Sequence, residues 1–281
     1  MKKILVVGSG GLVGNHFLEL FYEKYKIVGV DKNMDIKKLA DHHEFFDVLV
    51  FLAQSKEYIN KVFTEDLMNT NVNLLRYYLH QFSGKCPKVI LFSTGSVYQD
   101  SKEEINENSA LVNENITSYA ASKIMSEILA KSFASFYQSI AIVRPFTIYG
   151  AGQKSTMLFS RLLNNLKTKT PIEIGQQGGI EFNPVHAEDT ARFIDYLINR
   201  NFQGIEYFNH FGTEILTLKD LVDKISNILA LSPVISERDW PFKKMVATST
   251  NHDFHPTVSL ENGLSKMISG VKTNVEERNF S

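Results

Sequence analysis

The chain has 281 residues, 43% of them hydrophobic, and a formal net charge of -1 from 30 basic and 31 acidic side chains. This length suits one large α/β domain, or a core domain with a smaller partner, and the apolar fraction suffices for a sizeable core. The even charge balance, with no basic stretch in the sequence, argues against nucleic acid as a partner. A single cysteine, Cys86, excludes an internal disulfide framework and a cysteine-based metal site.

The N-terminus begins with two lysines, but the apolar run that follows stops at Gly8. That run is too short for the apolar region of a signal peptide. No stretch reaches the roughly 18 apolar residues that a membrane-spanning helix requires. We therefore predict a cytoplasmic protein with no membrane insertion.

Residues 4–7 form a continuous apolar run that predicts a strand buried on both faces. A glycine-rich turn follows at once, and residues 15–25 then carry the apolar side of a helix. Strand, glycine turn and helix in this order indicate dinucleotide binding. Gly8 permits a tight turn, Gly11 lets the backbone approach a pyrophosphate, and Gly14 lets helix and strand pack closely. The N-terminus of the helix offers free N–H groups to the phosphates.

A second predicted strand, residues 27–30, ends at Asp31, 17 positions after Gly14. A carboxylate at this place can accept hydrogen bonds from an adenosine ribose and repels a 2′-phosphate, so it favours NAD over NADP. The alternative is an ordinary turn residue at the end of a strand.

The third predicted strand covers residues 46–53, with Asp47 near its start. The residues between it and Asp31 are too few for a full crossover helix and a further strand. We expect a strand stub at 34–36 and a short helix at 37–43.

A long amphipathic helix is predicted at residues 64–82 and a fourth parallel strand at 88–92, which ends at Ser93 and Thr94. Ligands of open α/β sheets bind outside the carboxyl ends of the strands, so Thr94 stands where chemistry is expected. Capping of a turn is the alternative role for such a hydroxyl.

Tyr119 and Lys123 open a predicted helix that runs to residue 137. Residues four apart share a helix face, so the phenol and the ammonium lie on the same side. At an effective dielectric of about 20 and a separation of roughly 5 Å, this favours phenolate by about 3 kcal/mol. That is roughly two pKa units, enough to bring a phenol with a pKa near 10 towards general acid–base work. Taken alone, the spacing also fits an ordinary surface helix.

A fifth buried strand, residues 139–143, ends near Pro145, and a loop begins at Gly150. The elements after it are shorter and broken by Gly and Pro, which suggests a second lobe over the binding edge of the sheet. Helices are predicted at 157–166, 186–199, 218–229 and 260–268, and short strands at 171–175 and 206–209. We expect an α/β fold of two parts: residues 1–150 form a Rossmann-type doubly wound parallel sheet. Residues 151–281 mainly form a smaller substrate-binding lobe, with some segments returning to the sheet.

At this point the chain resembles the extended short-chain dehydrogenases/reductases of the NAD-dependent epimerase/dehydratase group, from Lys3 to about Leu264. The resemblance rests on motifs in the family order: Gly8, Gly11 and Gly14 as GxxGxxG, Asp31, Asp35-Ile36, residues 47–53, Asn71-Val72, Ser93-Thr94 with Val97-Tyr98, Tyr119 and Lys123 as YxxxK, Arg144-Pro145 with Tyr149-Gly150, and Phe182, Val185 and Asp189.

The resemblance implies an enzyme that modifies nucleotide sugars in polysaccharide biosynthesis, with Thr94, Tyr119 and Lys123 as catalytic residues. It implies NAD contacts at Gly8, Gly11, Leu12, Val13, Gly14, Asp31, Asp35, Ile36, Leu52, Ala53, Asn71, Tyr119, Lys123 and Phe146. It implies substrate contacts at Thr94, Gly95, Ser96, Tyr119, Thr147 and Arg238. No metal is expected, because the histidines lack carboxylates at ligand spacing.

Two departures from the family pattern bear on the substrate. Thr147 stands where the family usually has an asparagine that touches phosphates, and Ile180 replaces a nucleotide-contacting arginine. Arg238 resembles another phosphate arginine only weakly. The nucleotide (UDP, dTDP, GDP or CDP) therefore stays open, as does a substrate that is not a nucleotide sugar.

Three reactions share this machinery. Family 4,6-dehydratases carry Asp and Glu directly after the catalytic Thr, where this chain has Gly95 and Ser96, so dehydration is disfavoured. The short segment between Asp31 and Asp47 resembles that of 4-keto-sugar reductases, which we expect first, whereas Asp31 suits a 4-epimerase with tightly bound NAD. A non-catalytic dinucleotide-binding regulator is the alternative from another class. The family resemblance also implies a homodimer built on the Tyr119 helix and the long helix before it.

Overall fold

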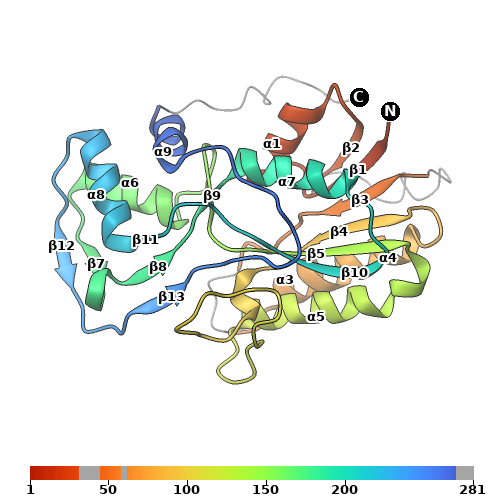
Figure 1. Cartoon of the computed structure of the whole chain (residues 1–281), viewed down its shortest axis with the longest axis horizontal. Coiled ribbons are helices and arrows are strands. Elements are labelled where there is room, and N and C mark those ends of the chain that lie inside the picture. Colours follow the sequence, from red (N-terminus) through yellow and green to blue (C-terminus); the bar gives the residue numbers. More distant parts are fainter. Residues whose placement is uncertain (32–44, 58–61, 270–281) are drawn as a thin grey trace.

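The computed structural model describes residues 1–31, 45–57 and 62–269. The expected strand stub at 34–36 and helix at 37–43 lie outside these residues. Among the described residues, six parallel strands make the central sheet (Figure 1). They are β1 (Lys3–Val7), β2 (Lys26–Val30), β3 (Val48–Phe51), β4 (Lys88–Phe92), β5 (Ser139–Pro145) and β10 (Gly204–His210).

The strands lie side by side in the order β10-β5-β4-β3-β1-β2, with every neighbouring pair parallel. The order reverses between the neighbours β1 and β3, as in a doubly wound sheet, where ligands bind outside the carboxyl ends of the strands. The α/β Rossmann-type fold predicted from the sequence is therefore confirmed. The chain returns to the sheet with β10, which lies 59 residues beyond the end of β5 at Pro145 (204 − 145).

Helices cover both faces of the sheet (Figure 1). On one face lie α1 (Leu12–Phe21) and α7 (Ala187–Asn199), which pack against alternate strand residues such as Ile4 and Val6. On the other face lie α4 (Leu74–Gln81) and α5 (Ser118–Ser132), which pack against the residues between them. Strands buried on both faces explain why their sequences are continuous apolar runs.

The helix predicted to run from Tyr119 to residue 137 ends at Ser132, and a 3₁₀ turn at Ala134–Phe136 follows it. Two earlier helices also differ from their predicted form. The first begins at Leu12 rather than residue 15, because Gly14 lies within its first turn. The second is continuous through the predicted span but starts as α3 (Glu65–Leu67) and passes through a π-helical turn, η1 (Met68–Asn73), before α4. The side chain of Thr64 caps its start by accepting a hydrogen bond from the Leu67 N–H.

The remaining elements form a smaller lobe with its own apolar core (Figure 1). Its helices are α6 (Leu158–Thr168), α8 (Leu218–Leu229) and α9 (Leu260–Ile268). Its strands are short: β6 (Ile148–Tyr149), β7 (Ile172–Ile174), β8 (Ile180–Phe182), β9 (Val185–His186), β11 (Leu216–Thr217), β12 (Ile235–Glu237) and β13 (Lys243–Met245). Three short 3₁₀ turns complete the described elements: η2 (Gly95–Val97), η3 (Ala134–Phe136) and η4 (Gln176–Gly178).

Candidate functional site

The glycine turn joins β1 to α1 at the carboxyl edge of the sheet. Gly8 has a φ of +89°, and a Cβ there would lie 2.7 Å from the backbone N of Ala53. Gly14 allows an equally close approach, since a Cβ on it would lie 2.4 Å from the carbonyl oxygen of Ser9. Both positions require glycine for steric reasons. The turn is thus held tightly against the loop after β3.

Helix α1 begins just beyond this turn, with Gly11 as its N-cap and no acidic residue in its first turn. The backbone N–H groups of Leu12, Val13 and Gly14 belong to that first turn, where an α-helix has no internal acceptors for them. An N-terminus of this kind attracts phosphate through its N–H groups and its dipole. These features fit the pyrophosphate of a dinucleotide.

Asp31 follows β2 and is exposed beside the glycine turn. A Cβ on Gly10 would lie 2.3 Å from the Asp31 carboxylate, so the acid and the turn are in immediate proximity. An exposed carboxylate at this place suits a ribose with free hydroxyl groups. Asp35 and Ile36, the other residues expected on the adenosine side, lie outside the described residues.

Asn71 lies in η1 and is fully enclosed. Its side-chain oxygen accepts from the Ser55 N–H at 2.9 Å, and its amide donates to Ser122 Oγ at 2.8 Å. The side chain therefore ties the segment after β3, which includes Leu52 and Ala53, to helix α5. Through these bonds it fixes the wall of the candidate cofactor site from behind.

Thr94 follows β4 and caps the 3₁₀ turn η2. The residue is 7% exposed, and its hydroxyl accepts from the Ser96 N–H at 3.2 Å. Gly95 is sterically fixed, because a Cβ on it would lie 3.0 Å from the ring of Phe146. Both roles that the sequence left open for Thr94 are thus compatible: the oxygen caps the turn, while the hydroxyl hydrogen can still be donated.

Tyr119 and Lys123 lie in helix α5, which begins where Thr117 Oγ1 accepts from the Ala120 N–H at 3.1 Å. The Lys123 ammonium lies 6.0 Å from the centroid of the Tyr119 ring and donates to the Phe92 carbonyl at 2.9 Å. Phe92 is two residues before Thr94, so the structure brings the end of β4 and the start of α5 together.

Burial lowers the pKa of Lys123 to about 8, an effect that the Glu127 carboxylate partly opposes. The ammonium is still mostly protonated at neutral pH, and it is more acidic than an ordinary lysine. A cation held in this buried position can stabilise a phenolate on the same helix face.

A buried ion pair behind these residues was not predicted from the sequence. Arg144, at the end of β5, donates to both carboxylate oxygens of Glu127 on α5, at 3.0 Å and 2.7 Å. Ser93 Oγ donates to the same carboxylate at 2.5 Å. The signal in the sequence was the spacing of four that continues from Tyr119 and Lys123 to Glu127.

The two other predicted substrate residues lie in different places. Thr147 follows β5, and its carbonyl accepts from the Val185 N–H at 2.9 Å, so it stands where the lobe joins the sheet. Arg238 follows β12 on the outer two-stranded sheet, and its guanidinium pairs with Glu173. The structure does not place Arg238 together with Thr94 and Tyr119.

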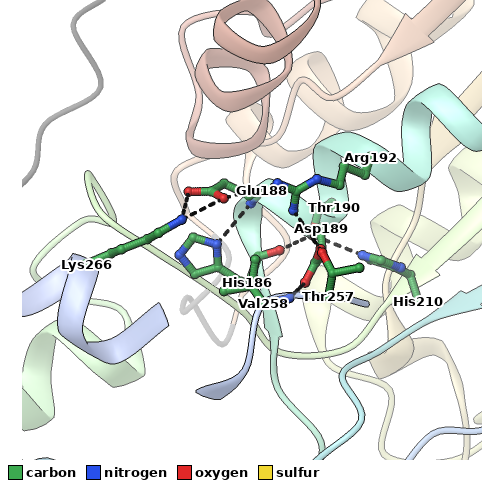
Figure 2. A network of polar contacts seen from close by, with 9 residues as sticks. All are labelled: His186, Glu188, Asp189, Thr190, Arg192, His210, Thr257, Val258 and Lys266. Carbon is green, nitrogen blue, oxygen red and sulfur yellow. Dashed lines mark hydrogen bonds and ion pairs between the residues drawn. The ribbon is translucent and has the colours of Figure 1, made fainter. Parts of the chain in front are cut away.

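Figure 2 shows the polar network that joins α7 to the lobe. Asp189 is fully buried and accepts from Arg192, from Thr257 Oγ1 and from the Val258 N–H. Glu188 pairs with Lys266 of α9 at 2.7 Å. His186 Nδ1 accepts from the Glu188 N–H, Thr190 Oγ1 donates to the His186 carbonyl, and Thr190 also contacts His210 of β10. These contacts hold the lobe in a defined position over the sheet edge.

With this geometry established, the chain can be compared with known proteins. Residues 4–209 match the model of the NAD dependent epimerase/dehydratase family. The chain belongs to this family, as its motifs indicate. The family consists of enzymes and is NAD dependent, which confirms the enzyme class and the cofactor predicted from the sequence.

Individual relatives are more distant. The chain is 28% identical to a GDP-6-deoxy-D-talose 4-dehydrogenase from Aggregatibacter actinomycetemcomitans over 240 residues, which cover 80% of each protein. It is 24% identical to a UDP-glucuronate 4-epimerase from Thermodesulfobacterium geofontis over 227 residues, which cover 76% of this chain and 68% of the relative. It shares the fold of the UDP-glucuronic acid 4-epimerase from Bacillus cereus in complex with NAD, with a TM-score of 0.81 at 23% identity. That match covers 95% of this chain and 98% of the other.

Among the described residues, no helix combines the length and the apolar character needed to cross a bilayer. In the same part of the chain, His, Cys, Asp and Glu side chains form no group of three or more suited to a metal ion.

Proposed function

We propose that this chain is an NAD-dependent nucleotide-sugar 4-epimerase. The observation that carries the proposal is the hydrogen bond from the Lys123 ammonium to the Phe92 carbonyl, which brings the start of α5, with Tyr119, to the end of β4, two residues before Thr94. The same sheet carries a glycine turn that lies against Asp31. The positions after Thr94 are Gly95 and Ser96, which supply no further acid or base for a dehydration. A site of this composition can carry out reversible oxidation at one carbon. Asp31 favours NAD, which lacks a 2′-phosphate, and an epimerase re-uses its NAD in each turnover.

In the proposed reaction, Tyr119 Oη takes the proton of the sugar C4 hydroxyl as that carbon is oxidised. Thr94 donates a hydrogen bond to the same oxygen and stabilises the charge that develops on it. Lys123 stabilises the Tyr119 phenolate by its charge. NAD, when bound, would accept the C4 hydrogen with two electrons and return both. Inversion requires the resulting ketone to present its other face, after which Tyr119 returns the proton.

The relatives support chemistry at C4. Both the Thermodesulfobacterium epimerase and the Aggregatibacter dehydrogenase are named for a reaction at that carbon. Their names differ in the nucleotide, UDP in one and GDP in the other, and Thr147 and Ile180 of this chain depart from the family pattern on that side of the site. The proposal therefore specifies the carbon and leaves the nucleotide open.

A 4-keto-sugar reductase is the second candidate, and it was the first expectation from the sequence. The short segment between Asp31 and Asp47 and the 28% identity to the Aggregatibacter 4-dehydrogenase favour it. The two candidates use the same three side chains. They differ in whether the cofactor is consumed.

Purified protein should be incubated with UDP-glucuronate, UDP-glucose, UDP-N-acetylglucosamine or a GDP-4-keto-6-deoxy sugar in the presence of added NADH, with products followed by NMR and NADH by absorbance at 340 nm. We expect a C4 epimer of a UDP-sugar with no net change in NADH. Stoichiometric loss of NADH with the keto sugar would instead establish the reductase. Tyr119→Phe should lower turnover at least a thousandfold and leave NAD binding intact, whereas wild-type turnover in this variant would refute the mechanism.

We also propose a homodimer built on α5 and the long helix before it, α3 to α4, as the family resemblance implies. Support comes from exposed apolar side chains on this face: Ile128 is 60% exposed, and Phe63 and Met125 are 38% and 37% exposed.

The division into a cofactor domain at 1–150 and a substrate lobe at 151–281 is likewise a proposal, and residues 187–210 are assigned to the cofactor domain. The cytoplasmic location stays a prediction.

A further inference from the structure

The three candidate catalytic groups sit on two separate elements, the end of β4 and the first turns of α5. Their relative placement therefore depends on what holds these elements together. The Lys123 ammonium donates to the Phe92 carbonyl, and Ser93 Oγ donates to the Glu127 carboxylate about one turn further along α5. Two successive residues of β4 and its extension are thus bonded to one face of one helix.

The backbone at Thr94 is extended, with φ −161° and ψ 150°. Neighbouring side chains in an extended chain point to opposite sides. A bond that fixes the direction of Ser93 therefore also fixes the direction of Thr94. Ser93 is additionally held by its N–H, which donates to the Val143 carbonyl of β5 at 2.7 Å.

Glu127 could not serve as this anchor without a counter-charge, because a lone carboxylate at 2% exposure carries a large desolvation penalty. Arg144 supplies the charge through two hydrogen bonds in fork geometry and is itself 3% exposed. Burial lowers the pKa of Arg144, but the hydrogen bonds and charge of Glu127 outweigh it and raise the pKa overall.

Arg144 extends the connection across the sheet edge. Its Nη1 donates to Tyr98 Oη at 2.9 Å, and Tyr98 donates to Asn209 Oδ1 at 2.7 Å. The Tyr207 ring of β10 lies 4.3 Å from the guanidinium carbon. The pair is thus part of a continuous buried chain of polar groups that runs from α5 to β10.

We propose that Glu127 and Arg144 are positioning residues, which hold Thr94 in register with Tyr119 and Lys123 and keep the charge beside Lys123 balanced. This inference rests on the proposed function, because the groups that are positioned are its candidate catalytic groups. Neither residue of the pair is assigned a contact with substrate or cofactor.

The charge balance gives a readout that a merely structural pair would not produce. The charged groups packed against Glu127 are Lys123 on its own helix and Arg144 from β5, with the phenols of Tyr98 and Tyr207 beyond Arg144. Glu127→Gln leaves Arg144 as an extra buried cation, which should move the Tyr119 phenol titration to lower pH. Arg144→Met leaves an extra anion, which should move the same titration to higher pH. Each shift should be about one pH unit, from Coulomb's law at an effective dielectric of about 20.

The experiment measures ultraviolet difference titration of the tyrosines in each ligand-free variant, with the same variant carrying Tyr119→Phe subtracted. Opposite shifts in the two single variants, and a return towards the wild-type midpoint in Glu127→Gln/Arg144→Met, are expected. Shifts of the same sign, or none, would overturn the charge-balancing part of the inference.

Ser93→Ala tests the positioning part and uncovers no charge, so it should fold even where the single charge variants do not. It should lower kcat about tenfold with KM and the Tyr119 midpoint unchanged. The matched control is Ser226→Ala, a buried serine of α8 whose hydroxyl has no hydrogen-bond partner in the described structure, and it should keep wild-type kcat. Wild-type kcat in Ser93→Ala would refute the positioning role.

Failure of the inference is distinguishable from failure of the proposed function. If Tyr119→Phe abolishes turnover while Ser93→Ala is fully active and the midpoints do not move, the inference alone fails. If Tyr119→Phe retains turnover, the proposed function fails. In that case the titrations still report whether the pair balances charge around the phenol, because they need no substrate.

Discussion

At the scale of single residues, the burial of Lys123 disfavours the charged form of its side chain. The side chain is 3% exposed, its ammonium donates to one carbonyl, and burial lowers its pKa to about 8. A lysine that is charged in both states but whose folded pKa is lowered destabilises the fold at neutral pH. This destabilisation diminishes as the pH rises from about 8 towards the unfolded value near 10.5. Charge is retained here at the expense of stability.

We therefore predict that Lys123→Met abolishes turnover and stabilises the fold. Removal of the buried charge should raise the free energy of unfolding by up to about 3 kcal/mol. Loss of the hydrogen bond to Phe92 should lower it by about 1 kcal/mol. Urea denaturation at pH 7 should show a higher midpoint for the variant. The exposed Lys167→Met on α6 should stay within about 0.5 kcal/mol of wild type. A lower midpoint for Lys123→Met would contradict the argument.

The residues with local signals were predictable from the sequence. Gly8, Gly14 and Asp31 follow buried strands at fixed offsets, and Tyr119 and Lys123 share a helix face, so short-range rules located all five. Arg144 and Glu127 were not paired in advance, because their contact depends on β5 lying beside β4. Arg238 was expected at the substrate on a weak match, and its place beside β12 follows from a lobe whose short strands carry no clear periodicity.

At the scale of elements, the junction of β1 and α1 requires glycine at position 14, because this residue has no Cβ. A methyl group at Gly14 would meet the carbonyl oxygens of Ser9 at 2.4 Å and of Gly8 at 2.7 Å, both of them backbone atoms. Backbone atoms cannot rotate away as a long side chain can. Glycine at position 14 also explains why α1 begins at Leu12 and not at residue 15 as predicted. Residues 12–14 can be helical only if they pack directly on the turn before them.

Gly14→Ala should accordingly push α1 away from the turn. We expect a loss of about 1–3 kcal/mol in the free energy of unfolding, as for other forced insertions of a methyl group, and at least tenfold weaker NAD binding. Calorimetric titration with NAD and thermal unfolding measure the two effects. Glu19→Ala, an exposed change on the same helix, is the control and should alter neither. Tight NAD binding by a stable Gly14→Ala protein would show that the turn has room to adjust.

At the scale of the whole molecule, the joint between sheet and lobe contains histidines that the fold keeps neutral. Burial lowers the pKa of His186 to about 4, against the partly opposing charge of Glu188, and lowers that of His210 to about 3. His186 Nδ1 accepts a hydrogen bond from the Glu188 N–H, a role that protonation of that nitrogen would abolish. Both side chains are 1% exposed.

These histidines predict acid sensitivity. The unfolded chain takes up protons near pH 6.5 and the folded chain only at about 4 and 3, so stability is present above 6.5 and is lost as the pH falls. Two histidines should together remove about 5 kcal/mol between pH 6.5 and 4.5. Urea denaturation across this range measures the loss. His210→Asn should lower the slope by about 1.4 kcal/mol per pH unit, the contribution of one proton, whereas the exposed His80→Gln should not change it. A stability that stays constant down to pH 4.5 would contradict this account.

The placement of α7 has a consequence for how the protein is made. Phe17 and Leu18 of α1 are buried against α7 residues such as Ile194, which the ribosome adds roughly 180 residues later. At about 5–20 residues per second, the apolar side of α1 stays exposed for about 10 to 35 s during synthesis, until α7 is made. Nascent chains should therefore bind chaperones until α7 emerges. For the same reason, a fragment ending at residue 150 should aggregate, even though it carries most of the candidate cofactor site.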